Sequence, residues 1–489
     1  MLSSCLHVLC AVVLCGCSTS SSPYRVADGL YCAGSYVQAE EVIKAEMKPD
    51  ASAEHVLDNL YMGSAAFAAR NYSAAVASFS SAESGLKEQD LQCVAGKGIG
   101  VVADVLSGGS GGYVAATYDE TMMNLYQAFS FLAQGNIDRA RVEFNRVNER
   151  QGRAAERNSA MIRRRQAAID NAKSSKSNKD AIEVTKGAKC DGIADLEREL
   201  RQWNPYADYM NPAAVFMCGA FLAVWGEDSS DSEKGIGYFK RAYGMHPSRV
   251  AANAISLMER RANAKVLPED RDFVLVLFEN GMGPVKEEIR KEMIIPYRYP
   301  IHVGISLPFL QHRPSAYDRL TVYDGSKCIG QTETIGVLDR VIAAEFEEDF
   351  KGAVARQLIG ATIRVGVQIV ALEALRRRLD DRVKKGKMDP FARDMALLTA
   401  GSALSSASSA LTHADTRIWS TLPNNYQAAI VPRPASGAIT VRNPSGTQII
   451  AEIPLEQTPE TEQTPRTTFV YAKVTTPGTP ATVFAVKGR

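Results

Sequence analysis

A fixed arrangement of small and aromatic residues recurs three times in the first half of the chain. In each copy a small residue is followed by a turn, a second small residue, a phenylalanine and a third small residue. The phenylalanines are Phe79, Phe144 and Phe239. Small residues let two helices approach closely, and the phenylalanine fills the gap beside the next helix pair. We therefore expect helical hairpins, with these three phenylalanines buried between paired helices.

This pattern resembles the tetratricopeptide repeat. The copies are not contiguous, because 65 residues separate Ala75 from Ala140 and 95 separate Ala140 from Gly235. The third copy also carries an insertion at its inter-helix turn, residues 227–234. We expect a degenerate array of helical hairpins over residues 55–265, the alternative being unrelated helices that have small residues at their contacts.

The C-terminal part, residues 266–489, changes character to short apolar runs bounded by turn residues. Such runs predict β-strands. They lie at 273–281, 301–310, 319–325, 427–432, 437–443, 447–454, 467–475 and 481–488.

Two long helices interrupt these strands, and they are predicted at 338–382 and 390–413. Apolar residues between Ala353 and Leu375 fall three or four apart, which predicts a helix buried on one broad face in a soluble core. The predicted fold class is therefore α+β, with an N-terminal all-α array followed by a mixed domain of short strands and two long helices.

Residues 1–16 contain no Asp, Glu, Lys or Arg, and their apolar core is too short to span a bilayer. The run Leu14-Cys15-Gly16-Cys17 resembles a bacterial lipobox. The resemblance implies a signal peptide over 1–16 and makes Cys17 the acylated first residue of the mature protein. The alternative is an apolar N-terminal helix of a soluble protein.

The Ser/Thr/Pro run at 18–23 suits a polar tether, so residues 17–54 are predicted to be a tether and a first helix. Ser18 stands where an Asp would resemble an inner-membrane retention signal. We therefore expect the protein in the cell envelope, anchored by lipid to the outer membrane and facing the periplasm.

Charge and spacing exclude several classes of function. Lys plus Arg number 56 and Asp plus Glu 55, a balance that argues against a nucleic-acid binder. Five cysteines remain after Cys17 and the signal peptide are removed, without a CxxC pair, and the chain has no HExxH motif or phosphate loop. We expect no metal, no cofactor and no nucleic-acid partner.

Two sets of residues near the predicted strands could carry chemistry. His302 and His312 could form a metal pair, although ordinary surface or core positions are the simpler interpretation. Glu345, Glu347, Glu348 and Asp349 could supply paired carboxylates for glycan cleavage, but carboxylates at this spacing more often form a solvated helix face.

Asp415, Arg417 and Trp419 alternate in a segment that we expect to be extended, which would place all three on one side. Asp415 would then pair with Arg417, and Trp419 would pack beside them. We expect a polar latch that closes the end of the preceding helix. A partner-binding or glycan-binding patch is the alternative.

Several segments together resemble a family of uncharacterised envelope lipoproteins of Gram-negative bacteria. Their members join tetratricopeptide-like helices to a C-terminal mixed domain. The matching segments are 118–120, 140–143, 209–213, 278–281 with Pro284, Lys286 and Glu287, and 414–419 with Leu422 and Pro423. The resemblance implies architecture and location, and it supplies no catalytic signature.

These observations predict a lipid-anchored cell-envelope scaffold or adaptor and not an enzyme. Its helical repeats would hold an envelope protein partner in a concave surface, with cell-wall or surface-component assembly as the expected process. The alternative is an envelope enzyme that acts on peptidoglycan or polysaccharide.

The predicted lipid anchor can be tested by a single substitution, because it depends on the thiol of Cys17. Only a thiol can take up the diacylglycerol, so Cys17→Ser should block both lipidation and processing. Mass spectrometry and membrane fractionation would check this. An unchanged mass together with unchanged membrane association in the variant would contradict the lipoprotein prediction.

Overall fold

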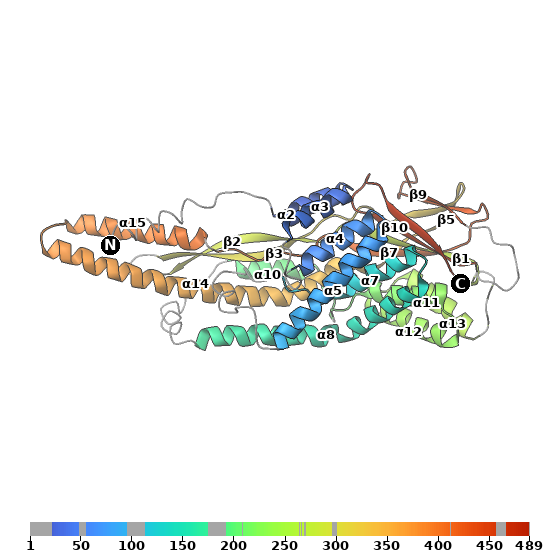
Figure 1. Cartoon of the computed structure of the whole chain (residues 1–489), viewed down its shortest axis with the longest axis horizontal. Coiled ribbons are helices and arrows are strands. Elements are labelled where there is room, and N and C mark those ends of the chain that lie inside the picture. The colour runs from blue at the N-terminus through green and yellow to red at the C-terminus, as the bar shows by residue number, and fades with distance from the viewer. Residues whose placement is uncertain are drawn as a thin grey trace.

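The structure, a computed structural model, describes residues 22–47, 55–94, 113–174, 192–207, 209–263, 265, 267, 270–295, 301–410, 412–455 and 466–488. It confirms the α+β prediction, with most helices preceding the sheets and two long helices inserted among the strands (Figure 1). The predicted signal peptide and Cys17 lie outside the described residues.

The part of the chain before the sheets forms ten helices among the described residues. They are α2 (Pro23–Cys32), α3 (Tyr36–Glu46), α4 (Val56–Ala68), α5 (Tyr72–Val94), α7 (Thr117–Ala133), α8 (Ile137–Ser174), α10 (Ile193–Arg201), α11 (Pro212–Trp225), α12 (Ser229–Met245) and α13 (Arg249–Ala262). Helical hairpins α4–α5, α7–α8 and α11–α12 stand where the three sequence copies predict them.

The three phenylalanines of the sequence pattern are buried in these hairpins. A Cβ placed on Gly63 would lie 2.5 Å from Phe79, and one on Gly219 would lie 3.0 Å from Phe239. Phe144 instead contacts the next hairpin, because its ring centroid lies 4.9 Å from that of Phe221. The glycines therefore give the rings the space that the sequence pattern predicts.

Helix α11 is the most deeply buried of these helices. All its residues are buried, which matches a sequence that is apolar on every side. Asn211 begins the helix, because its side chain accepts hydrogen bonds from the backbone N–H groups of Ala213 and Ala214, and Pro212 occupies the first turn.

The strands form three sheets. They are β1 (Phe273–Asn280), β2 (Val285–Ile295), β3 (Ile301–Gln311), β4 (Thr321–Asp324), β5 (Lys327–Gln331), β6 (Glu333–Val337), β7 (Asn425–Pro432), β8 (Ala438–Arg442), β9 (Ile449–Pro454), β10 (Thr468–Val474) and β11 (Thr482–Lys487). The strand orders are β11-β10-β1-β7-β6, β2-β3 and β5-β4-β8-β9. All eight strands predicted from the sequence are confirmed, whereas β2, β5 and β6 were not predicted.

The five-stranded sheet is the middle of three layers. Strand β1 is its centre, paired in parallel with β10 and antiparallel with β7. Leu275 and Leu277 on one face of β1 pack with the helices, while Val274 and Val276 on the other face pack with the four-stranded sheet. One hydrophobic core thus spans the boundary predicted at residues 265/266.

A buried polar cluster lies where α7 meets the five-stranded sheet. Glu279 of β1 and Lys473 of β10 are directly paired in register, and both side chains are fully buried. The Lys473 Nζ atom lies 3.4 Å from Glu279 and 3.0 Å from the Tyr126 hydroxyl. Tyr426 of β7 also donates to Glu279, at 3.1 Å, and Tyr126 of α7 does the same. The cluster therefore joins three strands and one helix.

An arm projects from this layered body (Figure 1). It consists of the β2–β3 hairpin, α14 (Leu338–Lys384) and α15 (Pro390–Ala410). Close packing of α15 on β3 depends on Gly304, whose N–H donates to Ser409 Oγ at 3.1 Å, because a Cβ there would lie 2.8 Å from that oxygen. Arg364 of α14 donates to the Gly304 carbonyl from the other helix.

The position of α14 corrects one prediction. The helix forms as expected and one side of its middle is buried, at Ala361, Val365 and Leu372, but the apolar residues behind the prediction do not all lie on that side. Val367 and Val370 are 66% and 71% exposed, because this part of α14 belongs to the arm and not to the layered body.

Phe144→Ala tests the packing of the hairpins. Loss of a fully packed ring should lower the free energy of unfolding by about 3–5 kcal/mol, measured by urea denaturation. Phe391→Ala is the matched control, because Phe391 is 73% exposed and should leave stability nearly unchanged. Equal stability of the two variants would contradict the assigned packing.

Candidate functional site

The candidate functional site is a charged pocket where α5 and α8 meet beside the first residue of α7. Its volume is about 560 Å³. Its walls carry five cationic and four anionic side chains among few apolar ones. The lining residues are Glu83, Leu86, Lys87, Thr117, Glu120, Arg146, Glu149, Arg150, Arg153, Glu156, Arg157 and Ala160.

Ion pairs fix the floor of the charged pocket. Arg150 lies 2.6 Å from Glu120, and Arg157 contacts the same carboxylate. Glu83 of α5 lies 3.6 Å from Arg150 and 3.5 Å from Arg146, so α5 and α8 are joined across the pocket. The floor is therefore held in one arrangement by ion pairs whose two carboxylates, Glu83 and Glu120, are mostly buried.

The rim of the charged pocket is exposed. Lys87 of α5 and Arg153, Glu149 and Glu156 of α8 all reach solvent. Exposed pairs of this kind contribute little stability, so these charges are available to an incoming group. The pocket thus combines a fixed floor with a rim that presents both signs of charge.

A buried carboxylate contacts the pocket-lining residue Thr117. Glu345 of α14 accepts hydrogen bonds from the backbone N–H groups of Thr117 at 2.8 Å and Tyr118 at 3.0 Å. These are free donors at the first turn of α7, where a helix favours an anion. Burial raises the pKa of Glu345 to about 8, although the two N–H groups act in the opposite direction and Asp119 adds to the rise.

Asp119 lies beside this contact. Its carboxylate accepts hydrogen bonds from the Tyr113 hydroxyl and from the Ala116 N–H, the latter at 2.8 Å. Burial raises the pKa of Asp119 to about 7, against these donors. Asp119 is 0% and Glu345 4% exposed, so neither side chain forms part of the accessible wall.

The burial of Glu345 corrects a second prediction. The acidic run was expected to form a solvated helix face, and Glu347, Glu348 and Asp349 are indeed partly exposed. Glu345 instead points into the protein and joins the arm helix α14 to α7. The buried Glu345 therefore does not share a solvated helix face with Glu347, Glu348 and Asp349.

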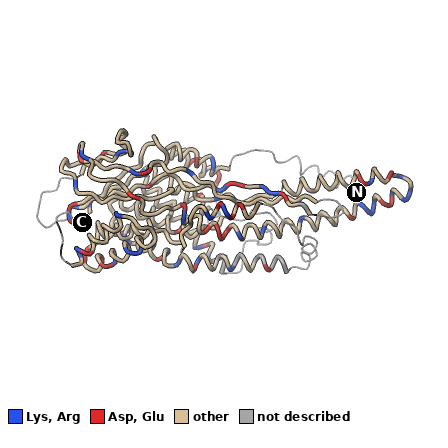
Figure 2. Tube along the Cα trace, turned by 180° about the vertical axis from the view of Figure 1, so that it is seen from behind, with Lys and Arg blue, Asp and Glu red and all other residues tan. Residues whose placement is uncertain are grey.

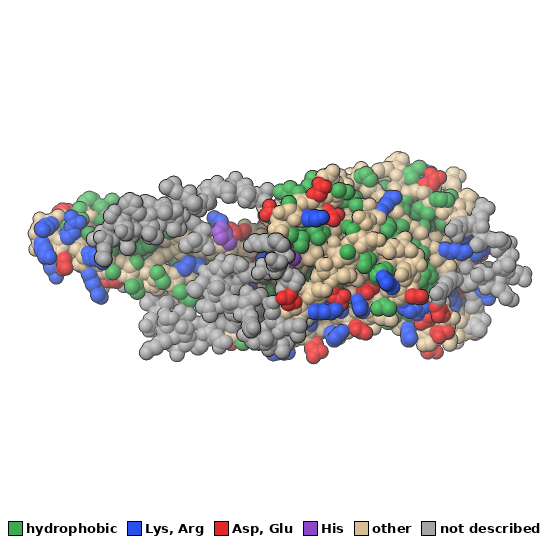
Figure 3. Space-filling model, viewed as in Figure 1, with side chains coloured by type: hydrophobic (Ala, Val, Ile, Leu, Met, Phe, Trp, Pro, Cys, Tyr) green, Lys and Arg blue, Asp and Glu red, His purple; other side chains and the backbone are tan. Residues whose placement is uncertain are grey.

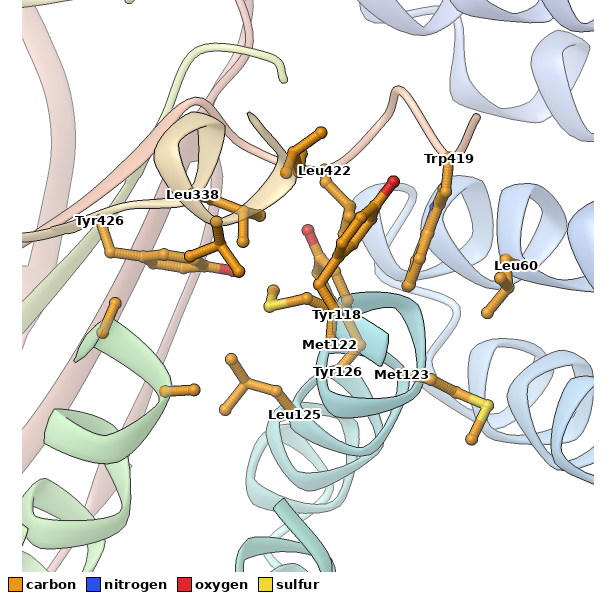
Figure 4. Packing of buried hydrophobic residues seen from close by; sticks show 14 of the residues in the cluster. Leu60, Tyr118, Met122, Met123, Leu125, Tyr126, Leu338, Trp419, Leu422 and Tyr426 are labelled. Atoms are coloured by element: carbon orange, nitrogen blue, oxygen red, sulfur yellow. The ribbon is translucent and has the colours of Figure 1, made fainter. Parts of the chain in front are cut away.

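Asp415 and Arg417 form the expected pair, since Arg417 Nε lies 2.8 Å from one Asp415 oxygen and its Nη2 lies 2.9 Å from the other. Trp419 does not lie beside them. It is fully buried, donates from Nε1 to Ser64 Oγ at 2.8 Å, and packs against Phe79 and Tyr126. Figure 4 shows Trp419 between α4 and α7. The segment therefore turns inward after Arg417, and the expected alignment of the three side chains is wrong.

His302 and His312 do not come together. They are ten residues apart along and just beyond the extended strand β3, a separation of about 30 Å. His312 instead contacts the Asp339 carboxylate at 2.9 Å. No group of three or more His, Cys, Asp or Glu side chains suited to a metal occurs in the described part of the chain.

The sequence did not reveal the charged pocket. Glu83, Glu120 and Arg150 are far apart in the chain, and each alone suits an exposed helix face. One sequence signal pointed to this region. Asp119 and Glu120 stand in the first turn of a mostly apolar helix, where acidic side chains are favoured.

Comparisons with protein-family models, with curated proteins and with solved structures gave no match. The resemblance to envelope lipoproteins therefore stays a prediction.

The Glu345 contact should make stability depend on pH. Because the folded protein holds a proton that the unfolded carboxyl loses above about 4.5, stability should fall as pH rises from about 5 to 8. We expect Glu345 to contribute a loss on the order of 3 kcal/mol in this range. Glu345→Gln should remove that part, while Asp119, whose pKa is also raised, keeps a smaller slope. Urea denaturation across the range would measure both slopes.

Glu347→Gln, a half-buried position on the same helix, is the matched control and should keep the slope of the original protein. Identical slopes for Glu345→Gln and the original protein would show that Glu345 is not the titrating group.

Proposed function

We propose that this protein is a lipid-anchored scaffold of the cell envelope that binds a protein partner at the charged pocket. The observation that supports this proposal most is the position of the pocket. It lies on the outer helices α5 and α8, away from the faces of the hairpins that are already occupied.

The inner faces of the hairpins pack on the chain's own sheet. Phe67 of α4 and Phe129 of α7 contact Tyr471 of β10, with ring centroids 5.5 and 5.3 Å apart. Trp225 of α11 contacts Phe469 of the same strand at 5.8 Å. These inner faces are therefore occupied by the chain's own sheet, and the outer side with the charged pocket is what a partner would reach.

The chemistry of the pocket favours a partner segment that carries charges of both signs. Arg150 and Glu120 at the floor already form an ion pair with each other, so a partner would gain little binding energy by contacting them. The rim charges of Lys87, Glu149 and Arg153 remain accessible, and complementary rim charges select partners and speed association. A flexible polypeptide segment fits these requirements better than a small apolar ligand.

Charge reversal at the rim tests the proposal. Lys87→Glu with Arg153→Glu should abolish site-specific photocrosslinks formed from position 149 in intact envelopes, because the partner would meet charges of the wrong sign. The melting temperature should stay within a few degrees, since both side chains are exposed and such substitutions change stability by about 0.5 kcal/mol or less.

Arg198→Glu with Lys240→Glu is the matched control, because it makes the same change in net charge on exposed helix surfaces outside the pocket. Crosslinks that survive rim reversal, or that disappear equally in the control, would sink the pocket as the binding site.

The second candidate function is an envelope enzyme that acts on peptidoglycan or polysaccharide. The raised pKa values of Asp119 and Glu345 suit a general acid, which is the observation in its favour. Both groups are buried and bound internally, however, so a glycan could reach them only after α7 and α14 separate. A folded Glu345→Gln variant that fails to complement a deletion strain, while still forming the crosslinks, would favour this second function.

A further inference from the structure

The free end of the arm carries exposed apolar side chains. Phe391, Met395 and Leu398 of α15 are exposed and follow one another at intervals of four and three residues, so they form one stripe on the helix. Val367 and Val370 are exposed on the neighbouring α14. Five of the large exposed hydrophobic residues of the described chain thus lie on this helical hairpin, and Figure 3 shows hydrophobic side chains along it.

The end of the hairpin is strongly basic. Residues 376–389 contain seven Lys or Arg and three Asp, a net charge of +4 in a chain whose total is +1. Figure 2 shows this concentration of positive charge at the turn between α14 and α15. A helix surface that only faces water does not require so many cations in one place. A surface that binds an anionic partner does.

Within the described part of the chain, six of these cations have no anionic partner. Arg376 pairs with Glu373 and Asp380, and Arg393 pairs with Asp380 and Asp394. Among the described residues the other cations of the turn have no carboxylate within 4.0 Å. They are Arg377, Arg378, Arg382, Lys384, Lys385 and Lys387.

The arm is built to present this end away from the body. Helix α14 has 47 residues, which corresponds to a length of about 70 Å. Its inner part is fixed by Glu345 at α7, and its middle is fixed by the bond from Arg364 to β3. One 18-residue window of α14 is apolar enough, by composition, for a membrane environment. Only 39% of that window is buried inside the protein, so most of it is not covered by other parts of the chain.

We propose that the free end of the arm binds the surface of an anionic phospholipid bilayer. The stripe of Phe391, Met395 and Leu398 enters the boundary between head groups and acyl chains, while the Lys and Arg side chains of the turn reach lipid phosphates. A second copy of this chain is a poorer occupant, because its arm would bring an equally basic end. This site is separate from the charged pocket, and the proposal does not depend on acylation of Cys17.

Vesicle flotation tests the proposal on the full chain carrying Cys17→Ser, so that no acyl group contributes. The protein should bind vesicles of phosphatidylcholine with phosphatidylglycerol far more tightly than vesicles of phosphatidylcholine alone, and high salt should reverse the difference. Lys384→Glu with Lys385→Glu and Lys387→Glu should weaken binding by roughly tenfold or more.

The matched control is Lys44→Glu with Lys234→Glu and Lys327→Glu, which makes the same change in net charge at exposed positions away from the arm. It should retain binding to the anionic vesicles. Equal weakening in the two triple variants would overturn the proposal, because binding would then follow the net charge alone.

The apolar stripe needs its own test. Phe391→Ser with Met395→Ser should also weaken binding to the anionic vesicles, whereas Val37→Ser with Val142→Ser, at exposed positions on other helices, should not. Unchanged binding in the arm variant would overturn the proposal. So would a sedimentation experiment in which the original protein is an oligomer that this variant dissociates, because the stripe would then be an interface between copies.

Discussion

The buried pair of Glu279 and Lys473 is the contact on which the rest of the arrangement depends. Removing two charges from water is costly, and one partner without the other would be strongly destabilising. The pair therefore admits one parallel register of β1 and β10, because a slip by one residue would turn Lys473 to the opposite face. Tyr126 brings α7 to the same point, so the register of the sheet also fixes where the helical hairpins dock.

Much of the fold could be predicted because its elements carry strong local patterns. Helix α11 is apolar on every side, β1 is a continuous apolar run, and the glycines facing Phe79 and Phe239 recur at fixed offsets. Strand β2 was missed because its sequence, VKEEIRKEMII, is mostly charged. A two-stranded hairpin on an arm exposes much of its surface, so its strand lacks the apolar signal of a sheet core.

The candidate site could not be predicted in the same way, because its parts meet only after folding. Glu345 belongs to an acidic run that suits solvent, yet it caps α7 more than 200 residues earlier in the chain. Trp419 has the spacing of an exposed latch, yet it is fully buried against Phe79 and Tyr126. Single charges in apolar strands, at Glu279 and Lys473, were a readable signal, since opposite charges in two buried strands can exist only as a pair.

The parallel pairing of β1 with β10 has a consequence for the order of folding. Strand β10 lies between β1 and β11 in the sheet, but it is made almost 200 residues after β1. Until residues 468–487 have been synthesised, the apolar inner faces of α4, α7 and α11 have an incomplete sheet to pack on. Contacts so distant in sequence form slowly. The helical hairpins therefore cannot reach their final packing while the last strands are still missing.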